Sequence, residues 1–294
     1  VKVVNRVNGI FNSEISVAFE LIESNDEIIF TDADTDPFEG NLDTSILIDE
    51  SQTVIDEAIG SENYDIGHTF GGAGGGMAST GPCQEGYKAS GVTGGTEGDA
   101  FAVDYVAHEI GHQFSMDHTF NTNSESCLEN RSPTAAFEPG AGTTIMSYNG
   151  ICRPDDIAQP HLPNNNSDPL FHSFSFEQAA EYVEGEGAEC GVVTDTGNTQ
   201  PNVDAGERYT VPASTPLYIE GAGSDPDGDA LTYSWEQRDL GPAAALNAPD
   251  DGAIPLFRSY APVLSPRRYL PQLESVVSGE LNDTEKMPRK PRTM

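Results

Sequence analysis

The chain has 294 residues, and 14 lysines and arginines against 48 aspartates and glutamates give a formal net charge of -34. Such an acidic surface repels phosphate backbones, so the composition argues against a nucleic-acid partner. The length allows one large or two ordinary domains, and 36% hydrophobic residues are enough for a core. No apolar run reaches the roughly 18 residues that a membrane span needs, so none is predicted.

The cysteines indicate the redox compartment. Cys83, Cys127, Cys152 and Cys190 are spaced by tens of residues, whereas zinc knuckles bring cysteines in C-x-x-C pairs. Two disulfides fit this spacing better than free thiols or a cysteine-bound metal. They predict a secreted, extracellular protein.

The first 190 residues alternate between helical and extended patterns. Apolar residues at helical spacing predict that the chain opens inside an amphipathic helix, over residues 1–11. Short apolar runs predict strands at residues 15–22, 27–30, 64–70, 77–80 and 88–93. Further helices are predicted from Asp49 or Ser51 to Gly60, over residues 99–114, and over residues 174–183. This order predicts an α/β fold with a mixed sheet behind the helix at 99–114.

The style of the sequence changes near residue 190. Residues 191–202 form a polar linker rich in Thr, Gly and Asn. Beyond it, short strands with turn signals are predicted at residues 208–211, 216–220 and 231–236. We therefore predict a catalytic domain over residues 1–190, a linker over 191–202, and a smaller all-β sandwich over 203–294, of which the chain holds all or a part. Such a module would be separable from the catalytic domain.

Three of the six histidines fall in one short window, which also contains Glu109. His108 and His112 are four residues apart, about 40° on one helical face, so both imidazoles can bind one ion. If the helix continued, His118 would face away from that ion. The helix must therefore break soon after Phe114, and Ser115 is the obvious place.

This set of residues suits hydrolysis. Three neutral imidazoles leave one position of a tetrahedral zinc ion open for water. Glu109 can accept a proton from that water as it attacks a carbonyl group. The sequence thus predicts a zinc-dependent hydrolase of amide bonds, and the alternative is a helix that carries two surface histidines by chance.

The same residues resemble the metzincin zinc endopeptidases, whose motif is H-E-x-x-H-x-x-G-x-x-H followed by a methionine turn, here T-I-M-S-Y around Met146. With the strings N-R-V-N-G-I-F, Y-D-I-G-H and G-V-T-G, residues 4–190 are most similar to reprolysin-like bacterial members. The resemblance implies Zn²⁺ on His108, His112 and His118, with Glu109 as the catalytic base. It also implies that Met146 forms a hydrophobic floor beneath the metal.

The chain departs from this family in several places. Ser115 stands where the family usually has a glycine in a left-handed conformation, which costs other residues about 1–2 kcal/mol. Thr119 stands where the reprolysin branch usually has aspartate. Tyr148 matches a tyrosine that binds zinc or the oxyanion in the astacin-like and serralysin-like branches, and this role and a structural one are both open. The family's first strand and cysteine-bearing prosegment are missing, so an N-terminal prosegment is a candidate partner.

The resemblance also bears on the disulfides. Cys127 and Cys152 flank the methionine turn, while Cys83 precedes the active-site helix and Cys190 ends the last helix. Four cysteines permit three connectivities. We predict the pairs 127–152 and 83–190, of which the resemblance supports the longer.

Two acidic runs are candidates for Ca²⁺. They extend from Asp32 to Asp43 and from Asp225 to Glu236 with calcium-loop spacing, but neither has the required glycine at its sixth position. Solvated turns are the alternative. Residues 225–235 also resemble the D-P-D-G-D-x-L-x-Y-x-W turn of polycystic-kidney-disease-like and cadherin-like sandwich domains.

The sequence therefore predicts a secreted zinc metalloendopeptidase that acts on protein or peptide substrates. A short edge strand near residues 77–80 would bind an extended peptide by strand addition. The alternative is an adhesion or matrix-binding protein whose protease-like domain is inactive. Neither the cleavage preference nor the oligomeric state follows from the sequence.

Overall fold

The computed structural model describes residues 1–95, 98–159, 162, 166–279 and 284–293. The chain forms two compact units. Unit 1 comprises Val1–Asp117 and Pro169–Val192, and unit 2 comprises His118–Asp168 and Val193–Met294. One boundary falls within the expected linker. The segment His118–Asp168, which we expected in the catalytic domain, belongs to the same unit as the C-terminal segment.

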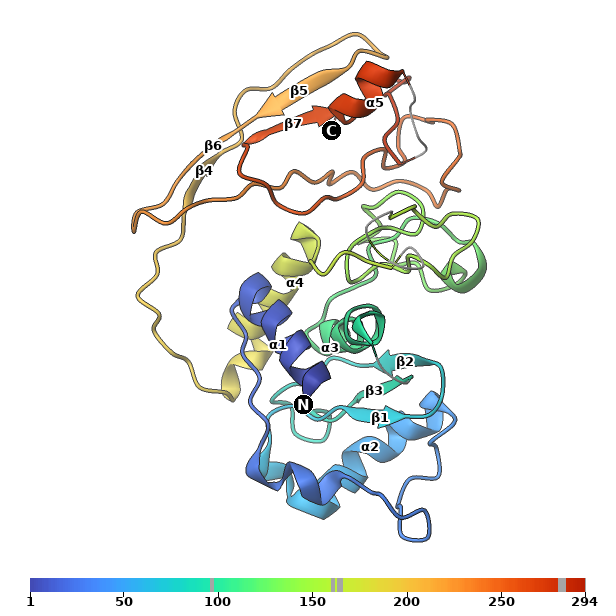
Figure 1. The fold of residues 1–294 in the computed structure, drawn as a ribbon, viewed down its shortest axis with the longest axis vertical. Helices are drawn as coiled ribbons and strands as arrows, with labels where there is room; N and C mark the ends of the chain where they lie inside the picture. Colours follow the sequence, from blue (N-terminus) through green and yellow to red (C-terminus); the bar gives the residue numbers. More distant parts are fainter. Residues whose placement is uncertain (96–97, 160–161, 163–165, 280–283, 294) are drawn as a thin grey trace. The chain divides into compact units, whose positions relative to one another are not determined.

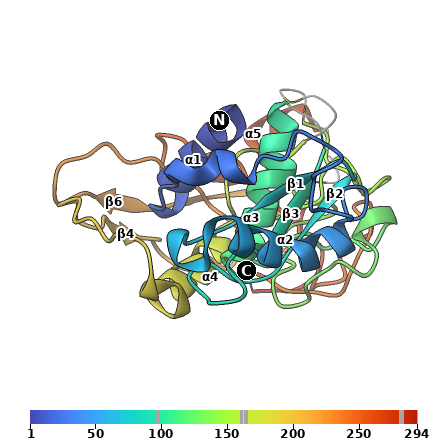
Figure 2. The ribbon, with the colours of Figure 1, turned by 90° about the horizontal axis from the view of Figure 1, so that it is seen from below.

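Unit 1 is built on a mixed three-stranded sheet in the order β1-β3-β2 (Figures 1 and 2). The central strand β3 (Gly91–Gly94) pairs in parallel with β1 (Thr69–Gly71) and antiparallel with β2 (Gly75–Ala78). In register, Thr93 of β3 lies between Phe70 of β1 and Gly76 of β2. The prediction of a mixed α/β fold is confirmed for this unit, and β2 is an edge strand of its sheet.

Helices cover both faces of this sheet. In Figure 1, α2 lies on one face and α3 on the other. The helices of unit 1 are α1 (Lys2–Ile15), α2 (Thr44–Ile59), α3 (His108–Gln113) and α4 (Ser173–Glu184). Helix α2 begins earlier than predicted, because Asp43, rather than Asp49 or Ser51, caps it by accepting a hydrogen bond from the Ser45 N–H. Its predicted end at Gly60 is confirmed.

The predicted strand at residues 15–22 is wrong. Helix α1 extends to Ile15, and Ser16 ends it in a left-handed conformation with φ 58°. Residues 17–22 have no ladder partner in the described part of the chain. The apolar alternation has another cause, since the Phe19 ring packs 5.1 Å from Phe11 and 6.0 Å from Phe114. An extended segment that buries one side against helices has the same period of two in sequence as a half-buried strand.

The other strands predicted in unit 1 have different bounds in the structure. The strand predicted at residues 77–80 is displaced by two residues, to Gly75–Ala78. The pattern at residues 64–70 becomes a strand only from Thr69, and the pattern at 88–93 only from Gly91. Residues 27–30 do not form a strand, because the 3-10 helix η1 (Glu23–Ile28) covers their start. Other short 3-10 helices are η2 (Ser61–Asn63), η4 (Glu125–Cys127) and η6 (Glu186–Glu189).

The C-terminal segment of unit 2 contains two separate two-stranded sheets. Strand β4 (Asn202–Asp204) pairs with β6 (Ala222–Ser224), and β5 (Leu217–Glu220) pairs with β7 (Arg267–Leu270), after which α5 (Leu273–Ser278) follows. The strands predicted at residues 208–211 and 231–236 do not form. A separate all-β sandwich is not shown by the described residues, so that part of the fold stays a prediction.

Within unit 2, the C-terminal segment packs on His118–Asp168. Leu246 N–H donates to the Asp155 carboxylate at 2.8 Å, and Ala244 N–H donates to the Asn121 carbonyl at 3.0 Å. The Arg258 guanidinium forms a buried ion pair with Asp168 at 3.2 Å. A cluster of Ile254, Leu256, Phe257 and Leu270 forms the apolar core of this segment.

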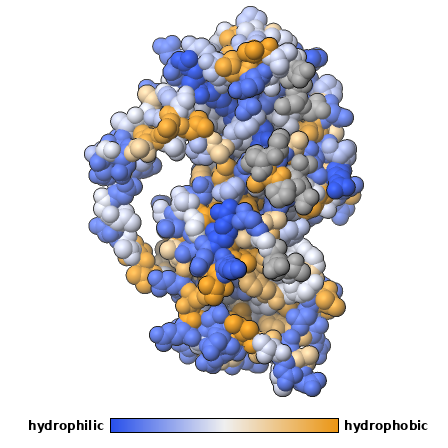
Figure 3. All heavy atoms as spheres, viewed as in Figure 1, coloured by the Kyte–Doolittle hydropathy of each residue, from blue (hydrophilic) through white to orange (hydrophobic). Residues whose placement is uncertain are grey.

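The surface shows no concentrated apolar region on the face drawn in Figure 3, where hydrophilic residues are interspersed with small apolar patches. This matches the strong negative charge of the sequence. Among the helices of the described residues, none combines the length and the apolar character required to cross a membrane.

Candidate metal centre

Two of the three candidate metal ligands, His108 and His112, lie on a helix that follows β3 in the chain. Helical structure begins at Asp99, continues as a π-helical segment, η3 (Phe101–Ala107), and becomes α-helical in α3 (His108–Gln113). The predicted helix over residues 99–114 is therefore nearly correct in its bounds. Apolar side chains of η3 are buried, and η3 contacts α1 and the sheet. The π-helical turns are typical of helices at functional sites.

Helix α3 ends where the sequence predicts a break. Ser115 has φ 68°, in the left-handed region. Its N–H donates to the His112 carbonyl at 2.9 Å, and the Met116 N–H donates to the Gly111 carbonyl at 3.0 Å. This pair of hydrogen bonds is the Schellman arrangement, which satisfies the last carbonyl groups of a helix and turns the chain sharply.

The three predicted histidines come together. One ligand atom from each of His108, His112 and His118 lies within 4.8 Å of the others. The Nε2 atoms of His108 and His112 are 3.1 Å apart. Two nitrogen ligands on one tetrahedral zinc ion at about 2.0–2.1 Å would be separated by about 3.3 Å. The spacing of the imidazoles therefore fits a single zinc ion.

Hydrogen bonds fix the protonation of two of these rings. Nδ1 of His112 lies 2.7 Å from the Met116 carbonyl, and Nδ1 of His118 lies 2.6 Å from the Asn130 carbonyl. A carbonyl oxygen can only accept, so each Nδ1 carries the proton and each Nε2 keeps its lone pair for a metal. Burial lowers the pKa of His112 although the Met116 carbonyl opposes this. The ring is therefore neutral, as a metal ligand must be.

Glu109 is buried beside these ligands and packs against the edge strand. Its side chain is 6% exposed, and burial raises the pKa of its carboxyl to about 8. A Cβ atom added at Gly76 of β2 would lie 2.4 Å from Glu109 Cγ and 2.5 Å from Oε1. Only glycine at this position lets the β2 backbone approach the carboxylate so closely.

Beneath the helix, a polar network holds α3 on the sheet. The Gln113 amide donates to the Gly67 carbonyl at 3.0 Å, so its oxygen faces His68 Nδ1 at 2.9 Å. His68 Nε2 lies 2.8 Å from the Thr93 hydroxyl on β3. Desolvation lowers the pKa of His68 to about 4, and the bond to Gln113 only partly opposes it. A neutral His68 therefore joins the residue after His112 to the central strand.

The methionine turn lies in unit 2. Met146 is fully buried, and its carbonyl accepts a hydrogen bond from the Thr119 N–H at 3.0 Å. The Tyr148 ring packs edge-on to His118 with ring centres 4.5 Å apart, and 4.9 Å from the Phe120 ring. Tyr148 therefore lies against a candidate ligand and also in an apolar cluster, which suits either of the two roles that the sequence left open.

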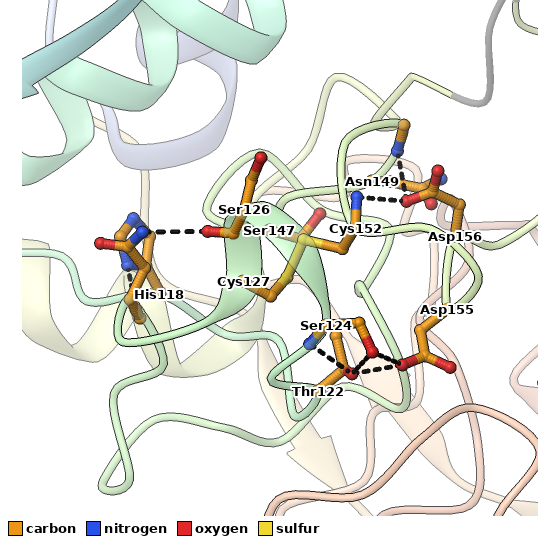
Figure 4. The surroundings of a disulfide bond; sticks show 12 residues. His118, Thr122, Ser124, Ser126, Cys127, Ser147, Asn149, Cys152, Asp155 and Asp156 are labelled. Carbon is orange, nitrogen blue, oxygen red and sulfur yellow. Dashed lines mark hydrogen bonds between the residues drawn. A yellow bond between two sulfur atoms is a disulfide. The ribbon is translucent and has the colours of Figure 1, made fainter.

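Both predicted disulfides are present. Cys127 pairs with Cys152 within unit 2, and Cys83 pairs with Cys190 within unit 1. Figure 4 shows the first of these, in the surroundings of His118. Nearby, the hydroxyl groups of Thr122 and Ser124 donate to the Asp155 carboxylate. This network and the disulfide fix the chain between the third histidine and the methionine turn.

Sequence reasoning missed Glu138 and Gly76. Glu138 carries a buried carboxylate that contacts the methionine turn and the residue after His118. No local pattern marks it, and the only signal is Thr119 where the resembled branch has aspartate.

The predicted calcium loops remain predictions. Within the described ranges, the three histidines are the one group of three or more such side chains that could hold a metal.

A mixed α/β unit whose helix carries H-E-x-x-H, with a third histidine beyond the helix end, defines a metallopeptidase. Residues 1–173 match the family described as metallo-peptidase family M12B, reprolysin-like. The match covers more than half of the chain, which therefore belongs to this family. Members normally bind zinc and hydrolyse peptide bonds. No curated protein matches the chain significantly.

Proposed function

We propose that the chain is a secreted zinc-dependent endopeptidase in which His108, His112 and His118 hold the metal. The observation that carries this proposal is the convergence of the three imidazoles within 4.8 Å, two of them with Nδ1 hydrogen-bonded to carbonyl groups. The two disulfides support an extracellular location, because such bonds persist in oxidising compartments.

Glu109 is proposed as the general base. When bound, zinc supplies Lewis-acid chemistry, since it lowers the pKa of a water molecule and polarises the scissile carbonyl. The raised pKa of Glu109 belongs to the metal-free site, and the charge of a bound ion would favour its ionised carboxylate. That carboxylate accepts the proton of the attacking water and returns it to the leaving amine. Its burial excludes bulk water, which would otherwise compete for that proton.

The edge strand β2 is proposed to bind the substrate. It pairs with β3 on one side and ends the sheet on the other. A peptide in extended conformation can add to such an edge through main-chain hydrogen bonds. Met77 on β2 is 41% exposed and available for an apolar contact with a substrate side chain.

Tyr148 is proposed to donate a hydrogen bond to the developing oxyanion. Its contact with the His118 ring supports this placement. Substitution Tyr148→Phe should then lower kcat with unchanged zinc content. Unchanged kcat would assign Tyr148 to the apolar cluster alone.

We also propose that residues 203–294 form a sandwich-like accessory part of the protein, supported by the pairings β4–β6 and β5–β7. Ca²⁺ binding at the two acidic runs and an N-terminal prosegment are further proposals on the sequence patterns. An inactive, matrix-binding protein is the rival function, and the buried, intact Glu109 disfavours it.

The substitution Glu109→Gln tests the proposed mechanism. Loss of a general base should reduce peptide hydrolysis about 10²- to 10⁴-fold, while zinc content stays near one ion per chain, because Glu109 is not proposed as a ligand. Peptide-library digestion and metal analysis of the same preparations measure both quantities. Wild-type turnover in this variant would refute the mechanism, and a wild-type chain without peptidase activity would favour the rival function.

A further inference from the structure

Thr119, which directly follows His118, is held through all of its polar groups. Its N–H donates to the Met146 carbonyl at 3.0 Å, and its carbonyl accepts from the Glu138 N–H at 2.9 Å. Its hydroxyl donates to Glu138 Oε1 at 2.6 Å. The backbone position after the third histidine is therefore defined by Met146 and Glu138.

The carboxylate of Glu138 is buried, and hydrogen-bond donors surround both of its oxygens. Only 1% of the residue is exposed. Oε1 accepts from the hydroxyls of Thr119 and Thr144, at 2.6 and 2.5 Å. Oε2 accepts from Thr143 N–H at 2.7 Å, Thr144 N–H at 3.2 Å and the Thr143 hydroxyl at 3.1 Å. These five neutral donor groups outnumber the roughly four lone-pair positions of a carboxylate, so no position is left without a donor.

This carboxylate joins two segments that both belong to the candidate metal centre. One is Thr119, and the other is the pair Thr143 and Thr144, which opens the methionine turn before Met146. Burying a carboxylate is costly unless every position is hydrogen-bonded. Because all its partners come from these two segments, the charge is stabilised only when they adopt their native arrangement.

Gly142 leaves space for the Glu138 side chain. Gly142 has φ 74°, and a Cβ atom there would lie 2.6 Å from Ser147 Cβ and 3.2 Å from Glu138 Cδ. The glycine therefore permits both the turn and the close approach of the carboxylate.

We infer that Glu138 is a positioning residue of the metal centre, whose carboxylate fixes Thr119 against the methionine turn and so holds His118 in place. His118 is then anchored twice, through its Nδ1 hydrogen bond to the Asn130 carbonyl and through its neighbour Thr119. Thr119 stands where the resembled branch has aspartate, and here the carboxylate that contacts this position comes from Glu138, 19 residues further along the chain. The inference rests on the proposed zinc site.

Zinc affinity of the full chain tests this inference. The metal-free protein is titrated with zinc in competition with a chromophoric chelator, and its thermal unfolding is recorded without metal. Glu138→Ala should weaken zinc binding about 10- to 100-fold, as expected for loss of a group that orients a metal ligand. Glu138→Gln should restore most of the affinity, because its oxygen can face the two backbone N–H groups while the threonine hydroxyls turn to accept from its NH₂.

Glu285 provides the matched control. It is another fully buried glutamate of unit 2, bonded to Arg268 at 2.7 Å and to the Gln272 N–H at 3.0 Å. Glu285→Ala should lower the unfolding temperature and leave zinc affinity unchanged. A folded Glu138→Ala variant with wild-type zinc affinity would overturn the inference, as would an equal loss of affinity in both variants.

If Glu138→Ala does not fold, substitutions of two threonines that donate to Glu138 test the inference instead. Thr119→Val and Thr143→Val each remove one hydroxyl bond to the same carboxylate with little change of volume. Only Thr119→Val should weaken zinc binding, and an unchanged affinity there would refute the inference. A wild-type chain that binds no zinc would instead refute the proposed function, so the two failures are distinguishable.

Discussion

Gly76 is the residue on which the packing of Glu109 against β2 depends. The substitution Gly76→Ala places a methyl group where Glu109 Cγ and Oε1 now lie, at 2.4 and 2.5 Å. Because β2 is held by β3, we expect the carboxylate to move instead of the strand. Peptide kcat/KM should fall at least about tenfold, as small misplacements of reacting groups have large effects, while zinc content is retained.

Gly74 provides the control, since nothing lies within 4 Å of a Cβ atom added there. Gly74→Ala should leave kcat/KM near the wild-type value. If Gly76→Ala were equally active, Glu109 would have room to adjust, and the close approach of β2 would have no catalytic consequence.

At the residue scale, spacing predicts the groups that lie in one window of sequence. His108, Glu109, His112 and His118 could be selected in this way, because a helix and its end bring them together. Gly76 and Glu138 could not. These two residues act through contacts with segments that are far away in the sequence. Such contacts leave no periodic pattern from which they could be predicted.

At the element scale, the left-handed residue Ser115 ends α3 and turns the chain away from the helix axis. Ser115 adopts a left-handed conformation at a cost of about 1–2 kcal/mol, and glycine would relieve this but lose more entropy on folding. We expect Ser115→Gly to stabilise the protein by about 0.5–1 kcal/mol, measured by denaturant unfolding of the metal-free chain.

The end of α1 offers a matched comparison, because Ser16 is also left-handed there, with φ 58°. Ser16→Gly should give a similar gain. A loss of stability in Ser115→Gly alone would mean that the serine side chain contributes an interaction that outweighs the strain of its backbone.

Helices were easier to predict than strands in this chain. The long runs of apolar periodicity in α1, α2 and α4 survive in the structure because each helix forms its own hydrogen bonds. The strands of unit 1 are three or four residues long and rich in glycine, so their bounds depend on partners elsewhere in the chain. For the same reason, the apolar alternation at residues 15–22 predicted a strand that finds no partner among the residues that the structure describes.

At the scale of the whole molecule, the polar linker led us to expect a separable C-terminal module. The contacts within unit 2 lead to a different expectation, because residues 241–258 hydrogen-bond to His118–Asp168. A chain that ends at residue 198 would expose those partners. We expect it to unfold at a lower temperature and to lose zinc and peptide hydrolysis. Wild-type kcat/KM on short peptides would support a separable module instead.

The buried pair of Arg258 and Asp168 tests this without truncation. Arg258→Met leaves Asp168 buried without its cation and should cost about 3–5 kcal/mol of unfolding free energy. The double variant Arg258→Met, Asp168→Leu should recover much of that loss, since both charges are gone. Urea denaturation measures the unfolding free energy of both variants. An unchanged unfolding free energy in Arg258→Met would show that this ion pair contributes little to holding the two segments of unit 2 together.

The connectivity of the disulfides determines which fragments would separate if the protein cleaved other copies of itself. The bridge Cys83–Cys190 spans 107 residues, and Cys127–Cys152 is nested inside it. If one molecule cuts another anywhere between these outer cysteines, the two pieces stay covalently tethered and can hold their places. A cut beyond Cys190 has no such tether and leaves the C-terminal segment bound only through its non-covalent contacts. Autolysis inside the loop should therefore be invisible on a non-reducing gel and appear as fragments only after reduction.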